Sequence, residues 1–345
     1  MNTAVDYARA DELAGHLVNG PLLDLAADAS ARPAALLVDL DDVEWTEDLV
    51  EELCALLDGV TPVLIGASAN PVPEIAAPVL DRLTLTLAPE APGDRWVAGE
   101  VAPVLAGVRA NPDAALALHG LLRTTAVVPV PTGLVAEAAA YSALLAGPEF
   151  GRWLAAAPQR RPGTSSEVLQ VERIKNTLRL TLNDPGRRNA FGHTLRDALL
   201  DAFRLPILDP SITAVEVLGN GPSFCAGGDL SEFGTAADPM AAYRARLGRS
   251  VAAALHQIAD RTRIDVHGAC VGAGIELAAF ARDLIATPDA WFCLPELGMG
   301  LVPGAGGTVS VARRIGTART AWMVLTGARV DATTALDWGL VDDVQ

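Results

Sequence analysis

The stretch VHGACVGAGIELAAFARD, residues 266–283, decides the fold that this sequence predicts. A short run of β-type residues ends at a glycine, and the glycines that follow lead directly into an apolar helical pattern. Such a junction leaves the first N–H groups of the helix unpaired, beside a partial positive charge. Glu276 lies in that first turn, where an acid stabilises the helix and can also serve in catalysis. The stretch therefore predicts an α/β fold with a place for a developing negative charge at the junction.

Short strand patterns and longer helical patterns alternate on both sides of this stretch. The β-type runs are AVEVLGN (214–220), RIDVHGA (263–269) and DAWFCLP (289–295), and a helical pattern covers 241–260. Upstream, LQVERIKNTLRLTLND (169–184) alternates apolar and polar residues as paired strands do, and TLRDALLDAFRL (194–205) has helical periodicity. This alternation predicts βαβ units and the α/β class.

The segment APQRRPGTSS, residues 157–166, has the composition of a linker, because it concentrates Pro, Gly, Ser and Arg between a helical pattern and a strand pattern. At 345 residues the chain exceeds the usual size of one domain. We therefore expect an N-terminal α/β domain over 1–156, a linker over 157–167 and a second domain over 168–345.

The first 156 residues show a similar rhythm of elements. Strand candidates are 34–40, 61–67, 82–88 and TAVVPV (125–130), and helical patterns cover 46–58, 97–108 and 113–123. Their order follows that of the second half, and this alignment puts Glu137 where Glu276 falls. Two interpretations stay open: a degenerate internal repeat that keeps Glu137 and Glu149 as relics, or two generic α/β segments whose Ala-rich helices look alike. A structural role is expected for this half.

The bulk composition excludes several classes of protein. Half of the residues are hydrophobic, a fifth are charged, and the formal net charge is −16 at pH 7. Nucleic acid and anionic membrane surfaces demand a basic face, so neither is expected as a partner. No apolar run is long enough for a membrane span and the N-terminus lacks a signal-peptide pattern, so a cytoplasmic location is expected. The four cysteines and five histidines show no metal-ligand spacing, which predicts free thiols and no metal site.

Two further glycine-rich segments carry residues suited to catalysis. In PSFCAGGDL (222–230), Gly227 and Gly228 can adopt dihedral angles that leave N–H groups pointing outward. In FCLPELGMGLVPGAGGT (292–308), a strand stops at Pro295 and Glu296 begins a loop that leads to a helix. Loops on a rigid frame carry function, although a tight turn and a solvated acid also explain these residues one at a time.

Together these segments resemble the enoyl-CoA hydratase/isomerase family, also called the crotonase superfamily, over about residues 169–344. NDPGRRNAF (183–191) is similar to the family's first-strand motif, FCAGGDL to its first oxyanion-hole loop and HGACVGAGIELA to the second. PELGMGLVPGAGGT and MVLTGARVDATTALDWGLVDDV (323–344) resemble the later catalytic and closing segments. The resemblance implies a crotonase-like spiral of ββα units in the C-terminal half.

Position by position, the resemblance implies that the backbone N–H groups of Ala226 and Ala273 form the oxyanion hole, and that Glu276 and Glu296 are the catalytic acids. It implies a lyase, an enoyl-CoA hydratase of fatty acid metabolism, which adds water across the double bond of a 2-enoyl-CoA thioester. An enoyl-CoA isomerase or an acyl-CoA thioester hydrolase would need only one acid on the same frame. A non-catalytic interaction module of this shape is a third alternative.

Coenzyme A, expected as part of the substrate rather than as a cofactor, carries several negative charges that local arginines must offset. Arg187 and Arg188 are the first candidates, followed by Arg244, Arg246 and Arg249. The other residues expected to border the substrate lie in or beside the glycine-rich segments: Gly227, Gly228, Asp229, Leu230, Phe233, Gly272, Pro295 and Gly304.

Members of this family usually continue past the segment that ends this sequence, with helices that complete the acyl pocket and build a trimer. We expect the N-terminal half to supply such helices here, because it needs an apolar surface to pack against; a different assembly is the alternative. A homo-oligomer, either a trimer or a pseudo-hexameric trimer, is expected.

Overall fold

The N-terminal half begins with a parallel five-stranded sheet. The structure is a computed structural model that describes residues 2–13, 33–59, 62–91, 93–158 and 167–345. The strands follow one another in chain order: β1 (Asn2–Arg9), β2 (Pro33–Asp39), β3 (Val63–Ala67), β4 (Leu85–Ala88) and β5 (Trp96–Ala98). Because β3 and β4 are covered on both faces, they consist of continuous apolar runs rather than alternating ones.

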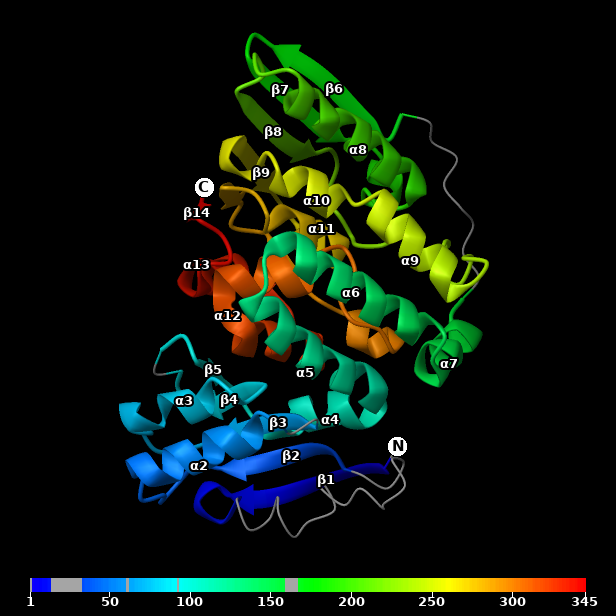
Figure 1. Ribbon diagram of the computed structural model, residues 1–345. Coiled ribbons are helices and arrows are strands. Elements are labelled where there is room, and N and C mark those ends of the chain that lie inside the picture. Colours follow the sequence, from blue (N-terminus) through cyan, green and yellow to red (C-terminus); the bar gives the residue numbers. More distant parts are fainter. Residues whose placement is uncertain (1, 14–32, 60–61, 92, 159–166) are drawn as a thin grey trace.

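Helices cover the two faces of this sheet. On one face, α2 (Glu47–Leu57) and α3 (Ala77–Leu80) pack against inward-facing residues such as Leu36 and Leu64. On the other face lie α4 (Val101–Ala110) and α5 (Pro112–Val127), which join the large core shared with the C-terminal half. On this face the strands β4 and β5 also contact a helix of the C-terminal half directly, so the sheet, α4 and α5 share one core with that half (Figure 1).

Two more helices, α6 (Val130–Leu145) and α7 (Pro148–Ala156), complete this layer. Proline occupies the first turn of α5, α6 and α7, where its missing N–H costs nothing. The prediction of a strand at TAVVPV (125–130) is wrong, because these residues end α5 and begin α6. A short apolar run does not distinguish a strand from a buried helix, and here α5 is buried against α12 (Gly307–Thr326).

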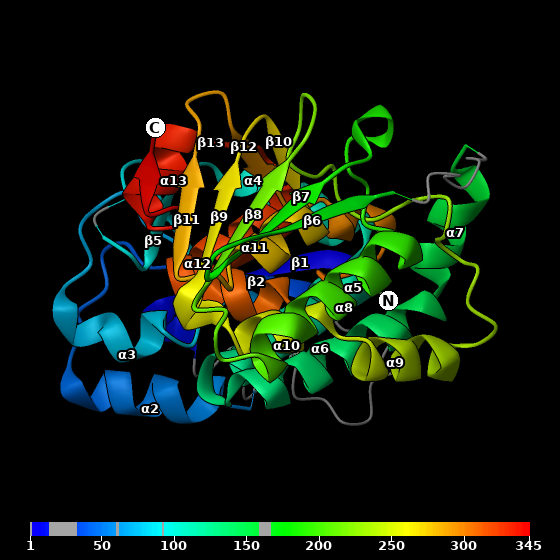
Figure 2. The ribbon, with the colours of Figure 1, turned by 90° about the horizontal axis from the view of Figure 1, so that it is seen from above.

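The C-terminal half contains two sheets. The larger has the order β14-β11-β9-β8-β7-β6, parallel except for the β6–β7 hairpin, and Figure 2 shows its strands fanned side by side. Its strands are β6 (Leu169–Ile174), β7 (Thr177–Leu182), β8 (Ala214–Gly219), β9 (Thr262–Val266), β11 (Asp283–Ala286) and β14 (Asp343–Val344). The smaller sheet contains β10 (Ala269–Val271), β12 (Trp291–Cys293) and β13 (Val330–Asp331).

Three strand pairs of the C-terminal half lead into a helix, which gives ββα units of the expected kind. In two of these units the chain passes from the larger sheet to the smaller one and then into a helix: β9, β10 and α11 (Ala273–Ala278), and β11, β12 and α12. The remaining helices are α8 (His193–Leu208), α9 (Pro239–Gly248), α10 (Val251–His256) and α13 (Ala332–Trp338). The α/β architecture of this half is as predicted.

The predicted internal repeat is not confirmed. The N-terminal sheet is wholly parallel and single, whereas the C-terminal half has a hairpin and a second sheet. The strand that should mirror β9 is helical, and Glu137 lies in the middle of α6 rather than in the first turn of a helix. The predicted linker, 157–167, falls largely on 159–166, outside the described residues.

Candidate active site

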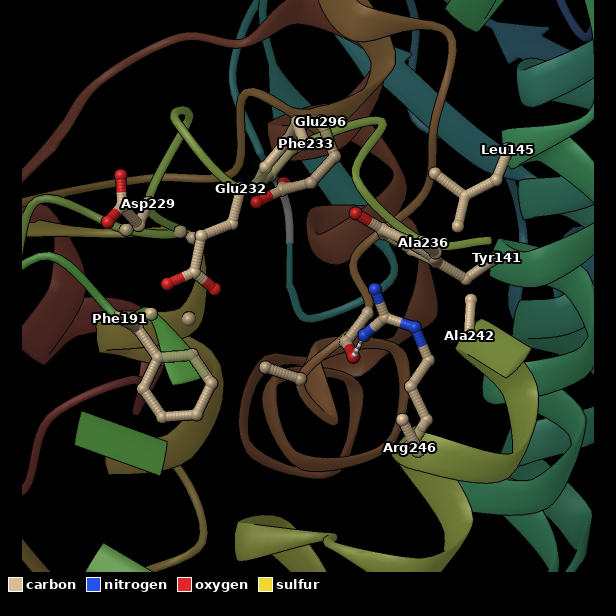
Figure 3. A pocket seen from close by; sticks show the side chains of 18 of the residues that line it. Tyr141, Leu145, Phe191, Asp229, Glu232, Phe233, Ala236, Ala242, Arg246 and Glu296 are labelled. Atoms are coloured by element: carbon tan, nitrogen blue, oxygen red, sulfur yellow. Dashed lines mark hydrogen bonds between the residues drawn. The ribbon is translucent and has the colours of Figure 1, made fainter. Parts of the chain in front are cut away.

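A pocket of about 1010 Å³ lies between the two halves of the chain. Residues of α6 and α7 line it from the N-terminal half, and residues of α9, α11 and the glycine-rich loops line it from the C-terminal half, with α9 next to α6 (Figure 3). Of the substrate-site residues predicted from the sequence, the following line it: Ala226, Gly227, Gly228, Asp229, Leu230, Phe233, Gly272, Ala273, Glu276, Pro295, Glu296 and Gly304. The pocket therefore gathers segments that are far apart in the sequence.

Glu276 is held in the first turn of α11, as the junction in the sequence predicted. Gly272, the residue before this helix, has a φ of 48°, a conformation that few residues other than glycine adopt. The Glu276 side chain is buried, and its Oε2 accepts hydrogen bonds from the N–H groups of Ala305 (2.7 Å) and Gly307 (2.9 Å). Ala305 and Gly307 lie at the N-terminal end of α12, so the carboxyl group lies between the N-termini of two helices.

Glu296 approaches the same helix terminus from another strand end. It begins the 3₁₀ turn Glu296–Met299 directly after Pro295, and its side chain is buried. A Cβ atom placed on Gly272 would lie 2.6 Å from Glu296 Oε1, so this carboxyl group rests against the entry to α11. Glu296 Oε2 has no hydrogen-bond partner among the described residues, although it is buried beside the pocket. The two predicted acids thus converge on one cavity.

Burial is the main cause that changes the acidity of both groups. Burial raises the pKa of Glu276 above its usual range, against the opposing effect of the Ala305 and Gly307 N–H groups and of Arg246. Burial and then repulsion from Glu276 raise the pKa of Glu296 well above its usual value. Glu276 Oε2 accepts two N–H bonds, whereas Glu296 Oε2 has no partner among the described residues, so the two carboxyl groups differ in environment.

The first oxyanion-hole prediction requires a correction. The Ala226 N–H donates a hydrogen bond to the carbonyl oxygen of Arg188 (2.9 Å), so it is not free to bind a substrate oxygen. The backbone continues past it as a parallel bridge between Gly228 and Phe191. In such a bridge the N–H of the central residue, here Gly228, points away from the partner strand. It has no acceptor among the described residues and belongs to a residue that lines the pocket.

Ala273, the second residue predicted for the oxyanion hole, lies at the junction that begins α11. Ala273 is the first residue of α11, and no acceptor for its N–H occurs in the described part of the chain. The two loops lie side by side, because a Cβ on Gly227 would meet the carbonyl oxygen of Val271 at 3.1 Å. The N–H groups of Gly228 and Ala273 are therefore neighbouring candidates for an oxyanion hole.

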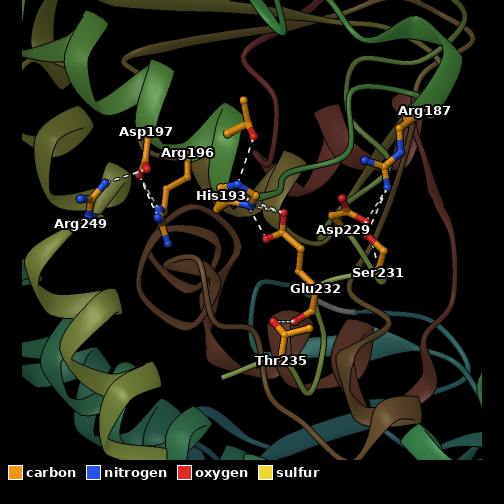
Figure 4. Close-up of polar contacts among 10 residues, drawn as sticks. Arg187, His193, Arg196, Asp197, Asp229, Ser231, Glu232, Thr235 and Arg249 are labelled. Carbon is orange, nitrogen blue, oxygen red and sulfur yellow. Dashed lines mark hydrogen bonds and ion pairs between the residues drawn. The ribbon is translucent and has the colours of Figure 1, made fainter. Parts of the chain in front are cut away.

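The predicted arginine pair lies outside the pocket. Arg187 donates to Asp229 Oδ1 at 2.6 Å, and the Asp229 side chain is only 5% exposed, so this ion pair braces the glycine loop (Figure 4). Arg188 is exposed in a left-handed conformation with φ of 54°. Neither residue lines the cavity, so the structure does not support them as residues inside the pocket. The NDPGRRNAF motif shapes the loop instead.

Of the later arginine candidates, Arg246 and Arg249 line the pocket and Arg244 does not, and Arg196 lines it as well. Arg196 of α8 and Arg249, just after α9, both pair with Asp197, which leaves two positive charges for one carboxylate (Figure 4). His193 Nδ1 lies 2.6 Å from Glu232 Oε1 near the same rim. Arg246, only a secondary candidate in the sequence, extends from α9 towards the pocket interior in Figure 3.

Residues of the N-terminal half contribute to the pocket in a way that sequence reasoning missed. Tyr141 of α6 is buried, and the Arg246 guanidinium lies 3.7 Å from the centre of its ring. Arg246 also donates to the carbonyl oxygen of Gly304 at 2.9 Å. Trp153 of α7 packs against Phe233 of the glycine loop, with ring centroids 5.8 Å apart. These helices therefore complete the pocket, as expected, and do more than support the fold.

Glu137 is the other missed residue. It lies in the apolar helix α6, where it is buried and lines the pocket. The signal in the sequence is a lone acid within VPTGLVAEAAAYSALL, because a buried carboxyl group needs a partner. Glu149, in contrast, accepts from the N–H groups of Asp113 (2.8 Å) and Ala114 (3.0 Å) at the start of α5 and does not line the pocket.

Neither a metal cluster nor a single membrane-spanning helix occurs in the described residues. Among them, no group of three or more His, Cys, Asp or Glu side chains is arranged to hold a metal ion. No single helix of the described chain has the length and apolarity to cross a membrane, and only the bent pair α6 and α7, at 63°, meets that test together.

Comparison with known proteins gives a consistent result. Residues 172–345 match the protein family described as "Enoyl-CoA hydratase/isomerase". Over 179 residues the chain is 36% identical to the "2,3-dehydroadipyl-CoA hydratase" of Escherichia coli (strain K12), which covers 52% of this chain and 69% of that protein. Among solved structures, an enoyl-CoA hydratase/isomerase from Marinobacter aquaeolei is 31% identical, with a TM-score of 0.48, covering 52% of this chain and 70% of that chain. An enoyl-CoA hydratase from Thermoplasma volcanium is 29% identical, with a TM-score of 0.48, covering 52% and 72%.

The family match covers nearly all of the C-terminal half, from residue 172 to residue 345, and contains Glu276, Glu296 and both glycine loops. The matched E. coli relative extends over the same half at an identity above 30%. On this evidence the chain belongs to the enoyl-CoA hydratase/isomerase family.

Proposed function

We propose that this protein is an enoyl-CoA hydratase, which adds water across the double bond of a 2-enoyl-CoA thioester. The observation that carries the proposal is the convergence of two buried glutamates, Glu276 and Glu296, on one pocket beside two free backbone N–H groups. An isomerase or a thioester hydrolase needs only one of these acids. The name of the E. coli relative, a hydratase of a 2,3-dehydroacyl-CoA, supports the same chemistry.

The N–H groups of Gly228 and Ala273 would bind the thioester carbonyl oxygen. Attack on the β-carbon moves electrons onto this oxygen, and the resulting enolate is the part of the reaction that most needs stabilising. Donors fixed in place before the reaction are each worth about 3–4 kcal/mol at such an oxyanion. The partial positive charge at the N-terminus of α11 adds to this effect.

The carboxyl groups divide the proton transfers. Glu276, whose Oε2 accepts two N–H bonds, is the group better suited to be ionised and to take a proton from the attacking water. Glu296, buried without a hydrogen-bond partner on Oε2, is better suited to be neutral and to give its proton to the α-carbon. One C–O bond, one C–H bond and the O–H bond of Glu276 form, while the C=C π bond, one O–H bond of water and the O–H bond of Glu296 break. A proton must then pass from Glu276 back to Glu296 before the next turnover.

The pocket must also hold the anionic coenzyme A. The protein carries a formal charge of −16, so the phosphates need local cations. Arg196 and Arg249 line the pocket with one acidic partner between them, which makes them better candidates than Arg187 and Arg188. The apolar wall around Trp153 and Phe233 is suited to the acyl group.

The test is an absorbance assay with crotonyl-CoA, in which hydration removes the conjugated enoyl chromophore. We expect turnover by the natural sequence and a loss of about 10²-fold or more in kcat for both E276Q and E296Q. E149Q is the matched control, because Glu149 is a buried glutamate outside the pocket that binds backbone N–H groups. Turnover that survives either pocket substitution would contradict a two-glutamate hydratase and favour an isomerase or a hydrolase.

A further inference from the structure

The loop that begins α12 is held by two buried glutamates from opposite halves of the chain. Glu276 Oε2 takes the N–H groups of Ala305 and Gly307, at 2.7 Å and 2.9 Å. Gly306 lies between Ala305 and Gly307 in the sequence, and its N–H donates a hydrogen bond to Glu137 Oε1 at 2.6 Å. Successive donors of one loop therefore go alternately to the two carboxyl groups.

Glu137 completes the pattern on the next residue. Its Oε2 accepts from the N–H of Thr308 at 3.0 Å and from the Thr308 hydroxyl at 2.6 Å. Both carboxylate oxygens of Glu137 are therefore bonded, and each of the two glutamate side chains is only 2% exposed. A helix N-terminus is stabilised by one acid, and a second buried acid at the same terminus adds repulsion.

The charges around this pair do not balance. Glu276 and then Glu137 repel a negative charge on Glu296 of the turn after β12, and all three buried carboxyl groups line the same pocket. Arg246 of α9 is the cation that acts on Glu276, and the Tyr141 phenol of α6 lies beside it. Cys225, whose thiol is buried, is also near Glu276. Three buried anions beside one cation are costly, so the carboxyl groups must titrate as a set.

We propose that Glu137 is a positioning residue of the active site, which controls how firmly Glu276 and Glu296 hold their protons through the shared N-terminus of α12. It does not need to touch substrate, because its own oxygens are occupied by the 306–308 backbone and Thr308. The reaction to which this applies rests on the proposed function, whereas the coupling among the three carboxyl groups does not.

The direction of the effect follows from the sign of the charge. Burial and then repulsion from Glu276 raise the pKa of Glu137 to about 8. Reciprocally, a negative charge on Glu137 helps to raise the pKa of Glu296. Replacing Glu137 with a neutral residue should therefore let Glu296 lose its proton at lower pH. Because Glu296 is the proposed acid catalyst, activity on the alkaline side of the pH profile should then also be lost at lower pH.

The first experiment compares pH profiles of kcat for crotonyl-CoA hydration in three variants. E137Q should move the alkaline limb to lower pH by roughly one unit. E137D, which keeps the charge, should return the limb towards its natural position even if kcat stays lower. E149Q, which removes a buried charge outside the pocket, should leave the limb in place. An E137Q limb that does not move, with only kcat reduced, would show a purely structural clamp and overturn the proposal.

The second experiment needs no activity and keeps Glu137 in place. Carbon-13 NMR of the labelled glutamate carboxyl groups in the ligand-free protein follows the titration of each group, and E137Q, E276Q and E296Q assign the three signals. Because coupling is reciprocal, E276Q should lower the pH at which Glu137 titrates. A Glu137 signal that titrates at the same pH in E276Q would contradict the proposal. If the natural protein fails to hydrate any enoyl-CoA while this coupling is present, the proposed function fails and the coupling stands.

Discussion

At the scale of single residues, the sequence motifs predict the type and position of the two acidic side chains, but they do not predict the hydrogen bonding of backbone N–H groups. The type and place of Glu276 and Glu296 follow from the glycine-rich segments around them, and both line the pocket. A backbone N–H is decided by its hydrogen bond, which no motif displays. Ala226 looked available in the sequence but donates to Arg188, and the free N–H lies two residues further on, at Gly228.

Removal of a single N–H tests the oxyanion hole at this scale. Ala273 is the first residue of α11, a position where proline fits without breaking the helix. A273P should therefore lower kcat for hydration by about 10²- to 10³-fold while the protein stays folded. E47P is the matched control, because Glu47 is the exposed first residue of α2 and lies outside the pocket. Near-natural kcat in A273P would remove Ala273 from the mechanism.

At the scale of helices and strands, the periodic patterns of the C-terminal half predicted the type of each element but not always its bounds, and the pattern at 125–130 predicted the wrong type. The run 214–220 contains β8, as predicted. The single helix predicted over 241–260 is two helices, α9 and α10, because the Ser250 side chain caps the start of α10 by accepting the N–H of Ala253. The strand predicted at 125–130 is helical because α5 is buried on α12, a contact between residues nearly two hundred positions apart. Local periodicity holds no information about such a contact.

A pair of glycines tests the packing of these helices. Gly107 of α4 has no room for a Cβ atom, which would overlap the carbonyl oxygen of Leu325 in α12. G107A should therefore lower the free energy of unfolding by about 1–3 kcal/mol. Gly120 of α5 is exposed and has open space around it, so G120A should raise that free energy by about 0.5–1 kcal/mol. Urea unfolding followed by circular dichroism measures both; equal effects would mean that α4 and α12 do not touch.

At the scale of the whole molecule, the two halves form one functional unit. The large core contains residues of both halves, such as Leu118 and Leu122 of α5 with Val309 and Val311 of α12. Glu137 reaches Gly306 across 169 positions of sequence, so no local pattern could have placed it at the active site. The sequence shows the acid Glu137 in an Ala-rich apolar helix, but it does not show that Glu137 contacts Gly306. The predicted trimer stays a prediction.

Three buried acids also make the stability of the whole protein depend on pH. The pKa of Glu137 rises from 4.5 to about 8 on folding, and those of Glu276 and Glu296 also rise. The folded state then holds protons that the unfolded chain releases between about pH 4.5 and pH 8, so the free energy of unfolding should fall as pH rises through that window. E137Q, which has one such group fewer, should show a shallower fall in urea unfolding. A slope as steep as that of the natural protein would contradict the raised pKa of Glu137.

The most direct test of the central claim is the fate of oxygen from water. We would incubate the protein with crotonyl-CoA in water enriched in oxygen-18 and analyse the product by mass spectrometry. Hydration predicts an intact 3-hydroxyacyl-CoA with one heavy oxygen on its β-carbon, and a loss of this product in E276Q and E296Q. Heavy oxygen in a free carboxylate, with release of the coenzyme A thiol, or no heavy oxygen in any product, would contradict the account.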